Sequence, residues 1–163
     1  MLIWLTLATA TAETFDKDAE GDVITTRTIA ASTTTILATL SDLRNHPGYW
    51  PDVCVTDWDF GERQTGLGAT AEVTYRGPLG WFRKLTMVIT EISTARLDID
   101  HPGEKGFVTT YTLQPAASGT TVEMHTWIYA PPKPLRGVYF KRIHPHFQYC
   151  HDGFLEGLAE AVE

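Results

Sequence analysis

Short runs of alternating apolar and polar residues occupy the middle of the chain. In residues 71–76, 84–90 and 96–100 every second side chain is apolar, and most of the others are charged or hydroxylated. Period two with one polar face is typical of antiparallel strands. Further runs rich in β-branched and aromatic residues bring the predicted strands to seven: residues 23–29, 53–60, 107–113 and 121–129.

A short helix is predicted directly after the first strand. Ser32 can cap it, and its apolar residues Ile36, Leu37 and Leu40 fall on one face. The helix should stop near Arg44, because residues 45–48 contain a His-Pro-Gly turn and the residue before proline avoids helical geometry.

A long helix is predicted at the end of the chain, over residues 135–162. Its apolar stripe comprises Phe140, Ile143, Phe147, Phe154 and Leu158. Pro145 lies inside this stretch and should kink the helix or split it in two. The order of strand, short helix, six strands and long helix predicts an α+β domain.

Three local motifs carry a resemblance to a known superfamily. They are Ile29-Ala30-Ala31 with Ile36-Leu37 and Leu40-Ser41-Asp42, then Tyr49-Trp50-Pro51, and Leu113-Gln114-Pro115 with Ser118-Gly119-Thr120. With this order of elements, residues 22–162 resemble the START-like (SRPBCC) superfamily, which includes Bet v 1 allergens, polyketide cyclases and coenzyme Q-binding proteins. The resemblance implies a helix-grip fold, in which a curved antiparallel sheet of about seven strands wraps around the C-terminal helix. It also implies a cavity for lipids, isoprenoids, steroids or polyketides.

Composition and charge narrow the function. The chain is 43% hydrophobic and 20% charged, as globular domains are, and 13 Lys+Arg against 20 Asp+Glu give a net charge of -7. A negative protein has little electrostatic basis for binding nucleic acid. A phosphate loop, a dinucleotide fingerprint and a G-x-S-x-G elbow are all absent from the sequence. This argues against the common kinases, dehydrogenases and hydrolases.

The N-terminus is interpreted separately from the domain. Residues 2–7 are apolar apart from one threonine, and Ala10-Thr11-Ala12 precedes Glu13 as a small-x-small cleavage site would. We therefore expect a signal peptide at 1–12, a linker at 13–21 and the domain at 22–163, with a secreted or periplasmic location favoured over a cytoplasmic one. The positively charged n-region of a signal peptide is missing, so an extra N-terminal strand and a mis-set start codon remain alternative interpretations.

Two cysteines and a cluster of histidines could carry chemistry. Cys54 and Cys150 are too few for a disulfide framework, and we interpret them as separate buried thiols, with a bridge left open. A metal site would pair His146 with Cys150, or His144 with His151, and add a carboxylate. Pro145 disturbs this spacing and neither HExxH nor CxxC is present, so we expect no metal and no cofactor.

The cavity wall is predicted from the inward faces of the strands and the long helix. The candidate ligand-binding residues are Trp50, Val73, Tyr75, Met87, Ile89, Tyr111, Met124, Phe140, His144, Phe147, His151 and Phe154. Weak catalytic candidates are His151, His144 and Tyr75, but no spacing selects them as a catalytic set. Most histidines of the cluster are expected to be surface or core residues.

Trp81 and Phe82 follow a Gly-Pro-Leu-Gly turn at a hairpin tip. Ordinary packing within the strand pair is the favoured interpretation. The alternative is an aromatic pair that covers the pocket or touches a membrane transiently, with Arg83 and Lys84 beside anionic head groups.

The sequence favours a non-catalytic binder or carrier of a hydrophobic small molecule, because apolar lining is plentiful and a catalytic set is not. The alternative is an enzyme of the polyketide cyclase or aromatase type that uses the same cavity. A third hypothesis is an interaction module whose cavity is filled by its own side chains. The ligand and the oligomeric state are not specified by the sequence.

Overall fold

The computed structural model describes residues 22–78, 80–103, 107–127 and 136–163. The predicted signal peptide (1–12) and linker (13–21) lie outside the described residues. All seven predicted strands form one antiparallel sheet in the order β1-β7-β6-β5-β4-β3-β2. The strands are β1 (Val23–Ile29), β2 (Val55–Phe60), β3 (Thr70–Arg76), β4 (Phe82–Ile92), β5 (Arg96–Asp100), β6 (Val108–Ala116) and β7 (Gly119–Trp127).

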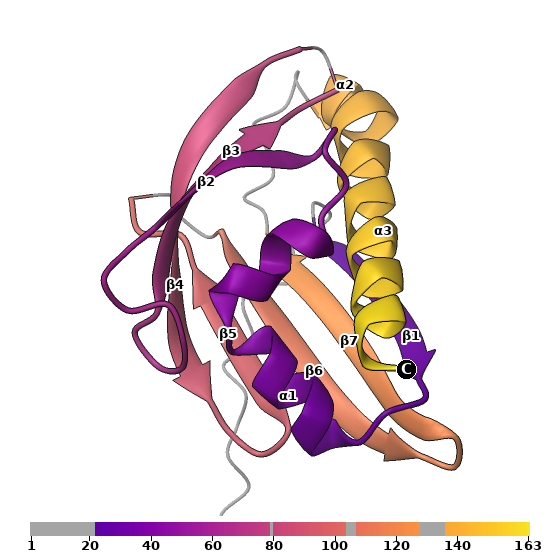
Figure 1. The fold of residues 1–163 in the computed structure, drawn as a ribbon. Coiled ribbons are helices and arrows are strands. Elements are labelled where there is room, and N and C mark those ends of the chain that lie inside the picture. Colours follow the sequence, from indigo (N-terminus) through magenta and orange to yellow (C-terminus); the bar gives the residue numbers. More distant parts are fainter. Residues whose placement is uncertain (1–21, 79, 104–106, 128–135) are drawn as a thin grey trace, which may run out of the picture.

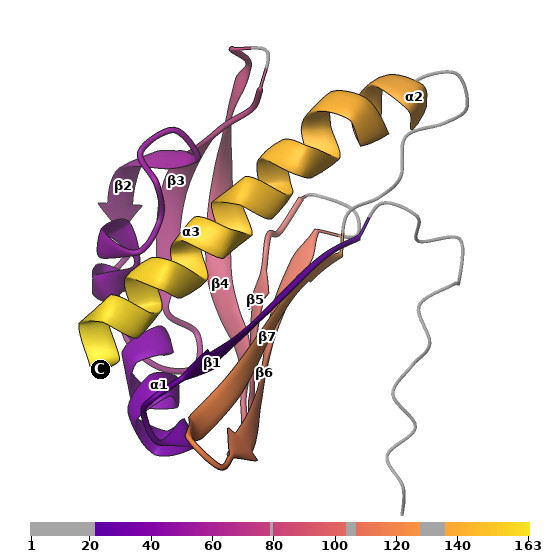
Figure 2. The ribbon, with the colours of Figure 1, turned by 90° about the vertical axis from the view of Figure 1, so that its right-hand side faces the viewer.

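The helices lie on one side of this sheet (Figure 1). They are α1 (Thr33–Leu40), the 3-10 turn η1 (Leu43–Gly48), α2 (Arg136–Val138), the π-helical turn η2 (Tyr139–Ile143) and α3 (His144–Val162). Figure 2 shows α3 running diagonally across the concave face of the sheet. The predicted α+β helix-grip architecture is confirmed.

Alternation of side chains determines which face of the sheet is covered. In β7 every second residue is buried, from Thr120 to Thr126, and in β4 the buried residues are Leu85, Met87 and Ile89. Register shifts lie between Thr56 and Asp59 of β2 and between Ile89 and Glu91 at the β4–β5 pair. Such bulges bend strands and increase their twist, which lets the sheet curve around a helix.

The short helix forms where its sequence predicts, but it ends at Leu40, four residues before Arg44. The Ser32 side chain accepts a hydrogen bond from the Thr35 backbone N–H at 3.1 Å, and Ile36 and Leu40 are buried. Asp42 then caps η1 by accepting from the Arg44 backbone N–H. Together α1 and η1 lead the chain to residues 49–54, which we call the connecting segment because they join η1 to β2.

Pro145 marks a change in the C-terminal helix. The chain is π-helical over η2 and becomes α-helical at His144, so the proline sits in the first turn of α3. A first-turn residue needs no intrahelical N–H partner, and proline is therefore accommodated there. The helix is not split at Pro145, because η2 and α3 follow one another without a gap, and only the helix type changes there.

Two glycines let α3 lie very close to the connecting segment. A Cβ atom on Gly157 would come within 2.8 Å of the Tyr49 Cα and 3.1 Å of its carbonyl oxygen. A Cβ on Gly153 would come within 2.5 Å of the Pro51 ring. Residues 153 and 157 are one helical turn apart, so they form a continuous strip of contact with the connecting segment.

The interpretation of Cys54 and Cys150 as separate thiols is wrong. They form a disulfide between the connecting segment and α3, with Cα atoms 5.8 Å apart in space and 96 positions apart in sequence. Because both residues belong to the surfaces that Gly153 and Gly157 bring together, the close approach also brings the two thiols together. That proximity depends on tertiary packing, which a spacing of 96 residues does not reveal.

Trp81 and Phe82, at the hairpin tip between β3 and β4, differ in how far their side chains are exposed to solvent. Trp81 packs on Gly77, where an added Cβ would meet the indole ring at 2.0 Å, and is 37% exposed. Phe82 is 75% exposed. Ordinary packing therefore describes Trp81 but not Phe82. Among the described helices, none combines the length and the hydropathy needed to cross a bilayer.

Replacing Gly157 by alanine should lower the free energy of unfolding by about 1–3 kcal/mol, because the new methyl group collides with backbone atoms of residue 49. Gly137→Ala is the matched control: nothing lies within 4 Å of its Cβ position. That variant should be neutral or stabilising by up to about 1 kcal/mol, since alanine favours helices. Urea unfolding of both variants with the disulfide intact measures the difference. Equal stabilities would contradict the close contact.

Candidate functional site

Aromatic rings fill much of the region between α3 and the concave face of the sheet. Phe154 of α3 is fully buried at their centre. Its ring centroid lies 5.5 Å from His46, 5.7 Å from Tyr49, 4.9 Å from Trp50 and 5.6 Å from Tyr111. The rings come from η1, the connecting segment and β6, so one helical residue joins three parts of the fold.

A second group of rings continues toward the N-terminal end of α3. Tyr75 of β3 lies 5.9 Å from Trp50, 5.8 Å from His101 and 5.8 Å from Phe107. Phe107 in turn lies 6.3 Å from Phe147 of α3. We call the whole set the ring cluster: His46, Tyr49, Trp50, Tyr75, His101, Phe107, Tyr111, Phe147, His151 and Phe154.

Several polar atoms of the ring cluster are buried without a hydrogen-bond partner among the described residues. Five of them are Trp50 Nε1, Tyr111 Oη, His151 Nδ1 and both ring nitrogens of His101. We call them the five unpaired atoms. Buried polar atoms in native proteins nearly always have a partner, and each exception costs about 1–3 kcal/mol. A sixth such atom, His46 Nδ1, belongs to η1, where the other nitrogen of the ring is paired with the Leu40 carbonyl at 2.9 Å.

His151 stands at the end of a buried chain of hydroxyl groups. Thr109 Oγ1 and Thr126 Oγ1 are 2.9 Å apart, and Thr126 Oγ1 is 3.0 Å from His151 Nε2. All three residues are at most 5% exposed. Because Nε2 is engaged with Thr126, Nδ1 is the atom that His151 has left for another partner.

Burial keeps the titratable groups of the ring cluster uncharged at neutral pH. It lowers the pKa of His151 to about 3, and the nearby His125 and His144 act in the same direction. Burial also lowers the pKa of His101 to about 4. The Thr86 backbone acts on this pKa in the opposite direction, although it forms no hydrogen bond of normal geometry with the imidazole ring. The pKa values of Tyr75 and Tyr111 are raised by burial. The walls therefore present hydrogen-bonding groups and no charge.

The structure brings most of the predicted cavity residues to one place. Trp50, Tyr75, Tyr111, Phe147, His151 and Phe154 belong to the ring cluster. Val73, Met87, Ile89 and Met124 are buried beside it. Phe140 and His144 lie further along, with their rings 6.1 Å apart. There His144 Nε2 donates to the Asp22 carbonyl at 3.0 Å and helps to hold α3 against β1.

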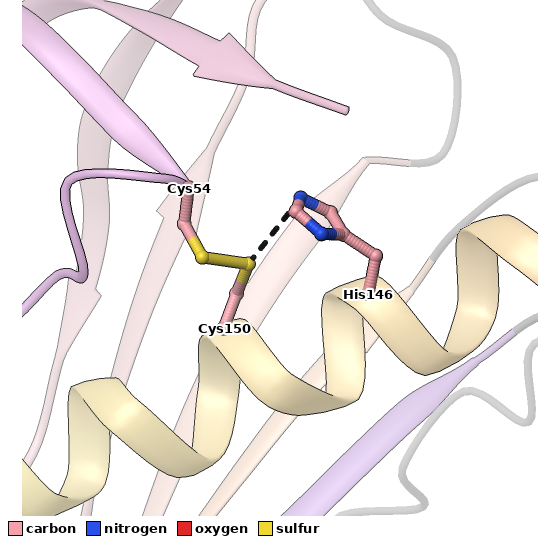
Figure 3. Close-up of side chains that lie close together, drawn as sticks. All are labelled: Cys54, His146 and Cys150. Atoms are coloured by element: carbon pink, nitrogen blue, oxygen red, sulfur yellow. Dashed lines mark hydrogen bonds between the residues drawn. A yellow bond between two sulfur atoms is a disulfide. The ribbon is translucent and has the colours of Figure 1, made fainter. Parts of the chain in front are cut away.

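His146 is on a different face of α3 from His144, as its spacing predicts. Its Nε2–H donates to the Arg76 carbonyl at 2.8 Å, and the same nitrogen is 3.6 Å from Cys150 Sγ. Figure 3 shows the imidazole beside the disulfide. This group lies at the contact with β3 and the connecting segment and borders the ring cluster, because the His146 ring centroid is 6.4 Å from that of Phe147.

Sequence reasoning missed His101, Phe107 and the hydroxyls of Thr109 and Thr126. His101 precedes Pro102 and Gly103, a sequence typical of a turn, and a turn gives no hint of a binding residue. A usable signal was present, because continuing the alternation of Leu97 and Ile99 by one step puts residue 101 on the same inward face. The threonines offered no comparable signal, since threonine is common in strands on either face.

A separate pocket of about 450 Å³ opens near the hairpin tip between β3 and β4. Its lining includes Val53, Arg76, Trp81, Phe82 and Lys84. Several of these side chains are solvent-exposed, and Lys84 is paired with Glu72 at 3.7 Å. The interior, with its buried and unpaired groups, is the better candidate for specific recognition.

Acid should destabilise the protein through its buried histidines. The unfolded chain protonates them near pH 6.5, whereas the folded-state pKa values are about 4 for His46, about 4 for His101 and about 3 for His151. Between pH 6.5 and about 4 the unfolded state thus binds more protons, and stability falls as the pH falls. The slope is up to about 1.4 kcal/mol per histidine per pH unit.

Urea unfolding at several pH values measures this slope. His46→Gln, which can still donate to the Leu40 carbonyl, should reduce the slope by about one proton. A free energy of unfolding that stays level from pH 7 to pH 5 would contradict burial of these rings in neutral form.

Comparison with solved structures finds the same fold in proteins of low sequence identity. The KanY protein is 21% identical with a TM-score of 0.75, over 86% of this chain and 96% of that one. TTHA0849 from Thermus thermophilus is 17% identical with a TM-score of 0.72, over 86% and 96%. The di-domain ARO/CYC protein StfQ of the steffimycin biosynthetic pathway is 14% identical with a TM-score of 0.63, over 87% of this chain and 50% of StfQ.

The fold is also that of Ara h 8.0201, a Bet v 1-like protein, at 12% identity and a TM-score of 0.58, with 86% of this chain and 96% of that chain covered. No curated protein matches the sequence significantly. The family described as "Polyketide cyclase / dehydrase and lipid transport" matches residues 20–163. The resemblance to the START-like superfamily is thereby confirmed, and the chain belongs to the polyketide cyclase/dehydrase and lipid-transport family.

Proposed function

We propose that this protein binds a hydrophobic small molecule carrying polar groups, between α3 and the concave face of the sheet. The observation that supports this most directly is the set of five unpaired atoms within an otherwise apolar and aromatic region. Membership in a family described by polyketide cyclisation and lipid transport supports a hydrophobic ligand.

A self-filled core explains the unpaired atoms poorly. A core selected only for packing would use phenylalanine or leucine where Trp50, Tyr111 and His151 stand, since an apolar side chain of similar shape avoids the cost of an unmet hydrogen bond. A ligand with polar groups forms hydrogen bonds with these atoms. Binding then removes the free-energy cost of leaving them unpaired, and this gain adds to the affinity. The unpaired atoms therefore favour a binder over an interaction module with a filled cavity.

The chemistry of the walls narrows the ligand class. An indole N–H such as that of Trp50 only donates, whereas the Tyr111 hydroxyl and neutral histidines can donate or accept. A ligand should therefore present at least one acceptor oxygen to Trp50. Uncharged walls disfavour a buried carboxylate, and aromatic neighbours favour planar rings. A hydroxylated aromatic or quinoid molecule fits better than a plain fatty acid.

An enzyme of the polyketide cyclase or aromatase type is the second candidate. The observation in its favour is the Thr109–Thr126–His151 chain, which ends on the unpaired Nδ1 inside the region. Against it, a histidine with a pKa of about 3 is a weak base at neutral pH. We therefore keep binding as the proposed function, with His151, His144 and Tyr75 as the residues to test for turnover.

Contact with a membrane during ligand exchange stays a proposal for the hairpin tip. The exposed ring of Phe82 supports it, beside Trp81 and Lys84.

The disulfide supports the predicted export, because disulfides persist mainly in oxidising compartments.

Native mass spectrometry of protein purified from its own host tests the proposed function. The expected result is a reproducible adduct that, once extracted, is a hydrophobic molecule with carbonyl or hydroxyl oxygens. An adduct-free protein that also fails to bind emodin, a hydroxylated anthraquinone, would sink the proposal.

Tyr111→Phe should separate binding from folding. Removing an unpaired hydroxyl should leave the free energy of unfolding unchanged or raise it, while the affinity for emodin falls about tenfold for one lost hydrogen bond. Tyr49→Phe is the control, because its hydroxyl is not among the unpaired atoms. Tryptophan fluorescence quenching gives both affinities. Equal losses in the two variants, or none in Tyr111→Phe, would count against a role of the interior hydroxyl.

A further inference from the structure

We propose that Cys54, Cys150 and His146 hold a zinc ion when the disulfide is reduced. The three side chains each offer one ligand atom, and these atoms all lie within 4.8 Å of one another (Figure 3). The site lies between α3 and the connecting segment, at the edge of the ring cluster, where the His146 ring centroid is 6.4 Å from that of Phe147. The inference does not depend on which ligand the interior binds.

The geometry of the three residues is close to what zinc needs. Zinc binds thiolate sulfur at about 2.3 Å and imidazole nitrogen at about 2.0–2.1 Å, so two ligands of one tetrahedral ion are about 3.5–3.8 Å apart. Cys150 Sγ and His146 Nε2 are already 3.6 Å apart. Once the S–S bond is cleaved, rotation of the two cysteine side chains can separate the sulfurs, because the Cα atoms are 5.8 Å apart.

The positions in the fold favour a stable ligand set. His146 and Cys150 are four residues apart on α3, so they project from the same helix face one turn apart. Cys54 faces them from the connecting segment, which the Gly153 contact holds against the helix. The cysteines are 1% and 3% exposed, while His146 is only partly buried and leaves a route for the ion.

The ligand types select the metal. Two thiolates and one imidazole match the Cys₂His ligand set of zinc sites that keep a fourth position for water. Hard cations such as Mg²⁺ and Ca²⁺ prefer oxygen ligands and would bind poorly. Two thiolates also neutralise the charge of the ion, which suits a site with buried sulfur atoms.

The conversion balances with a dithiol as reductant. The dithiol reduces the Cys54–Cys150 disulfide to two thiols and is itself oxidised to a cyclic disulfide. Zinc then replaces the two thiol protons, which leave to solvent. At His146 the proton on Nε2 moves to Nδ1, so Nε2 exchanges its hydrogen bond to the Arg76 carbonyl for the metal.

Disulfide and zinc exclude each other at this site, yet both join α3 to the connecting segment. In an oxidising compartment the covalent bond supplies the link, and in a reducing one the metal does. The sequence expectation of no metal is thus replaced, for the reduced protein, by a three-ligand site.

Cobalt titration tests the inference with a spectroscopic probe for zinc. The full chain is reduced under anaerobic conditions, and Co²⁺ is added. We expect one equivalent to bind, with thiolate-to-cobalt charge-transfer bands and the d–d bands of a tetrahedral site, and Zn²⁺ should displace it. The oxidised protein should give no such bands. Near-UV circular dichroism of the reduced, zinc-loaded protein should keep the aromatic bands of the oxidised protein.

Variants assign the ligands. His146→Gln keeps a donor for the Arg76 carbonyl but lacks the imidazole, and it should bind Co²⁺ at least about tenfold more weakly. Cys54→Ser should lose the charge-transfer bands. His125→Gln is the control, because His125 lies on β7 and is paired with Asp22, away from the three ligands. This variant should bind Co²⁺ as the wild type does. Absence of charge-transfer bands in the reduced wild type, unchanged affinity in His146→Gln, or loss of the near-UV signal on reduction and loading would each overturn the proposal.

Discussion

The close approach of α3 to the connecting segment is the contact on which the rest of this fold depends. Gly153 and Gly157 permit it, because a side chain at either position would strike Pro51 or the backbone of Tyr49. The Cys54–Cys150 bond then fixes it covalently. Since Trp50 lies within this segment, the same contact carries its indole under the helix beside Phe154 and His151.

The other side of α3 is held by polar contacts. His144 donates to the Asp22 carbonyl, the Gln148 side chain donates to the Thr25 hydroxyl, and His151 contacts Thr126. A helix tied along both sides keeps its middle face over the sheet, where the ring cluster lies. The contacts along the two sides of α3 stabilise the folded protein. They offset the free energy that is lost where polar atoms in the middle are buried without hydrogen bonds.

The sequence predicted the fold well because its signals are local. Alternation in the strands, the Ser32 cap and the helical stripe each act over a few residues, and the structure confirms them. Pro145 likewise marked the change in helix type. Such signals determine elements and their order, and a family resemblance then adds the topology that local patterns lack.

The parts that could not be predicted arise from contacts between distant segments. The disulfide joins residues 96 positions apart, and no local pattern reports that separation. The His101 ring lies 5.8 Å from that of Tyr75 although β4 separates β5 from β3 in the sheet, and no local pattern reports this contact. The lowered pKa of His151, to about 3, is a property of its burial, whereas the sequence shows only a histidine with an ordinary pKa.

A ligand bound among the ring cluster should engage its unpaired atoms. The most direct measurement is a ¹H–¹⁵N NMR titration with emodin that follows the indole N–H signals, with Trp50 assigned through Trp50→Phe. The Trp50 indole signal should move downfield as its N–H gains an acceptor, while that of Trp81, which lines the surface pocket at the hairpin tip, stays in place. A shift of Trp81 without one of Trp50 would contradict the account, because the ligand would then be bound in the surface pocket.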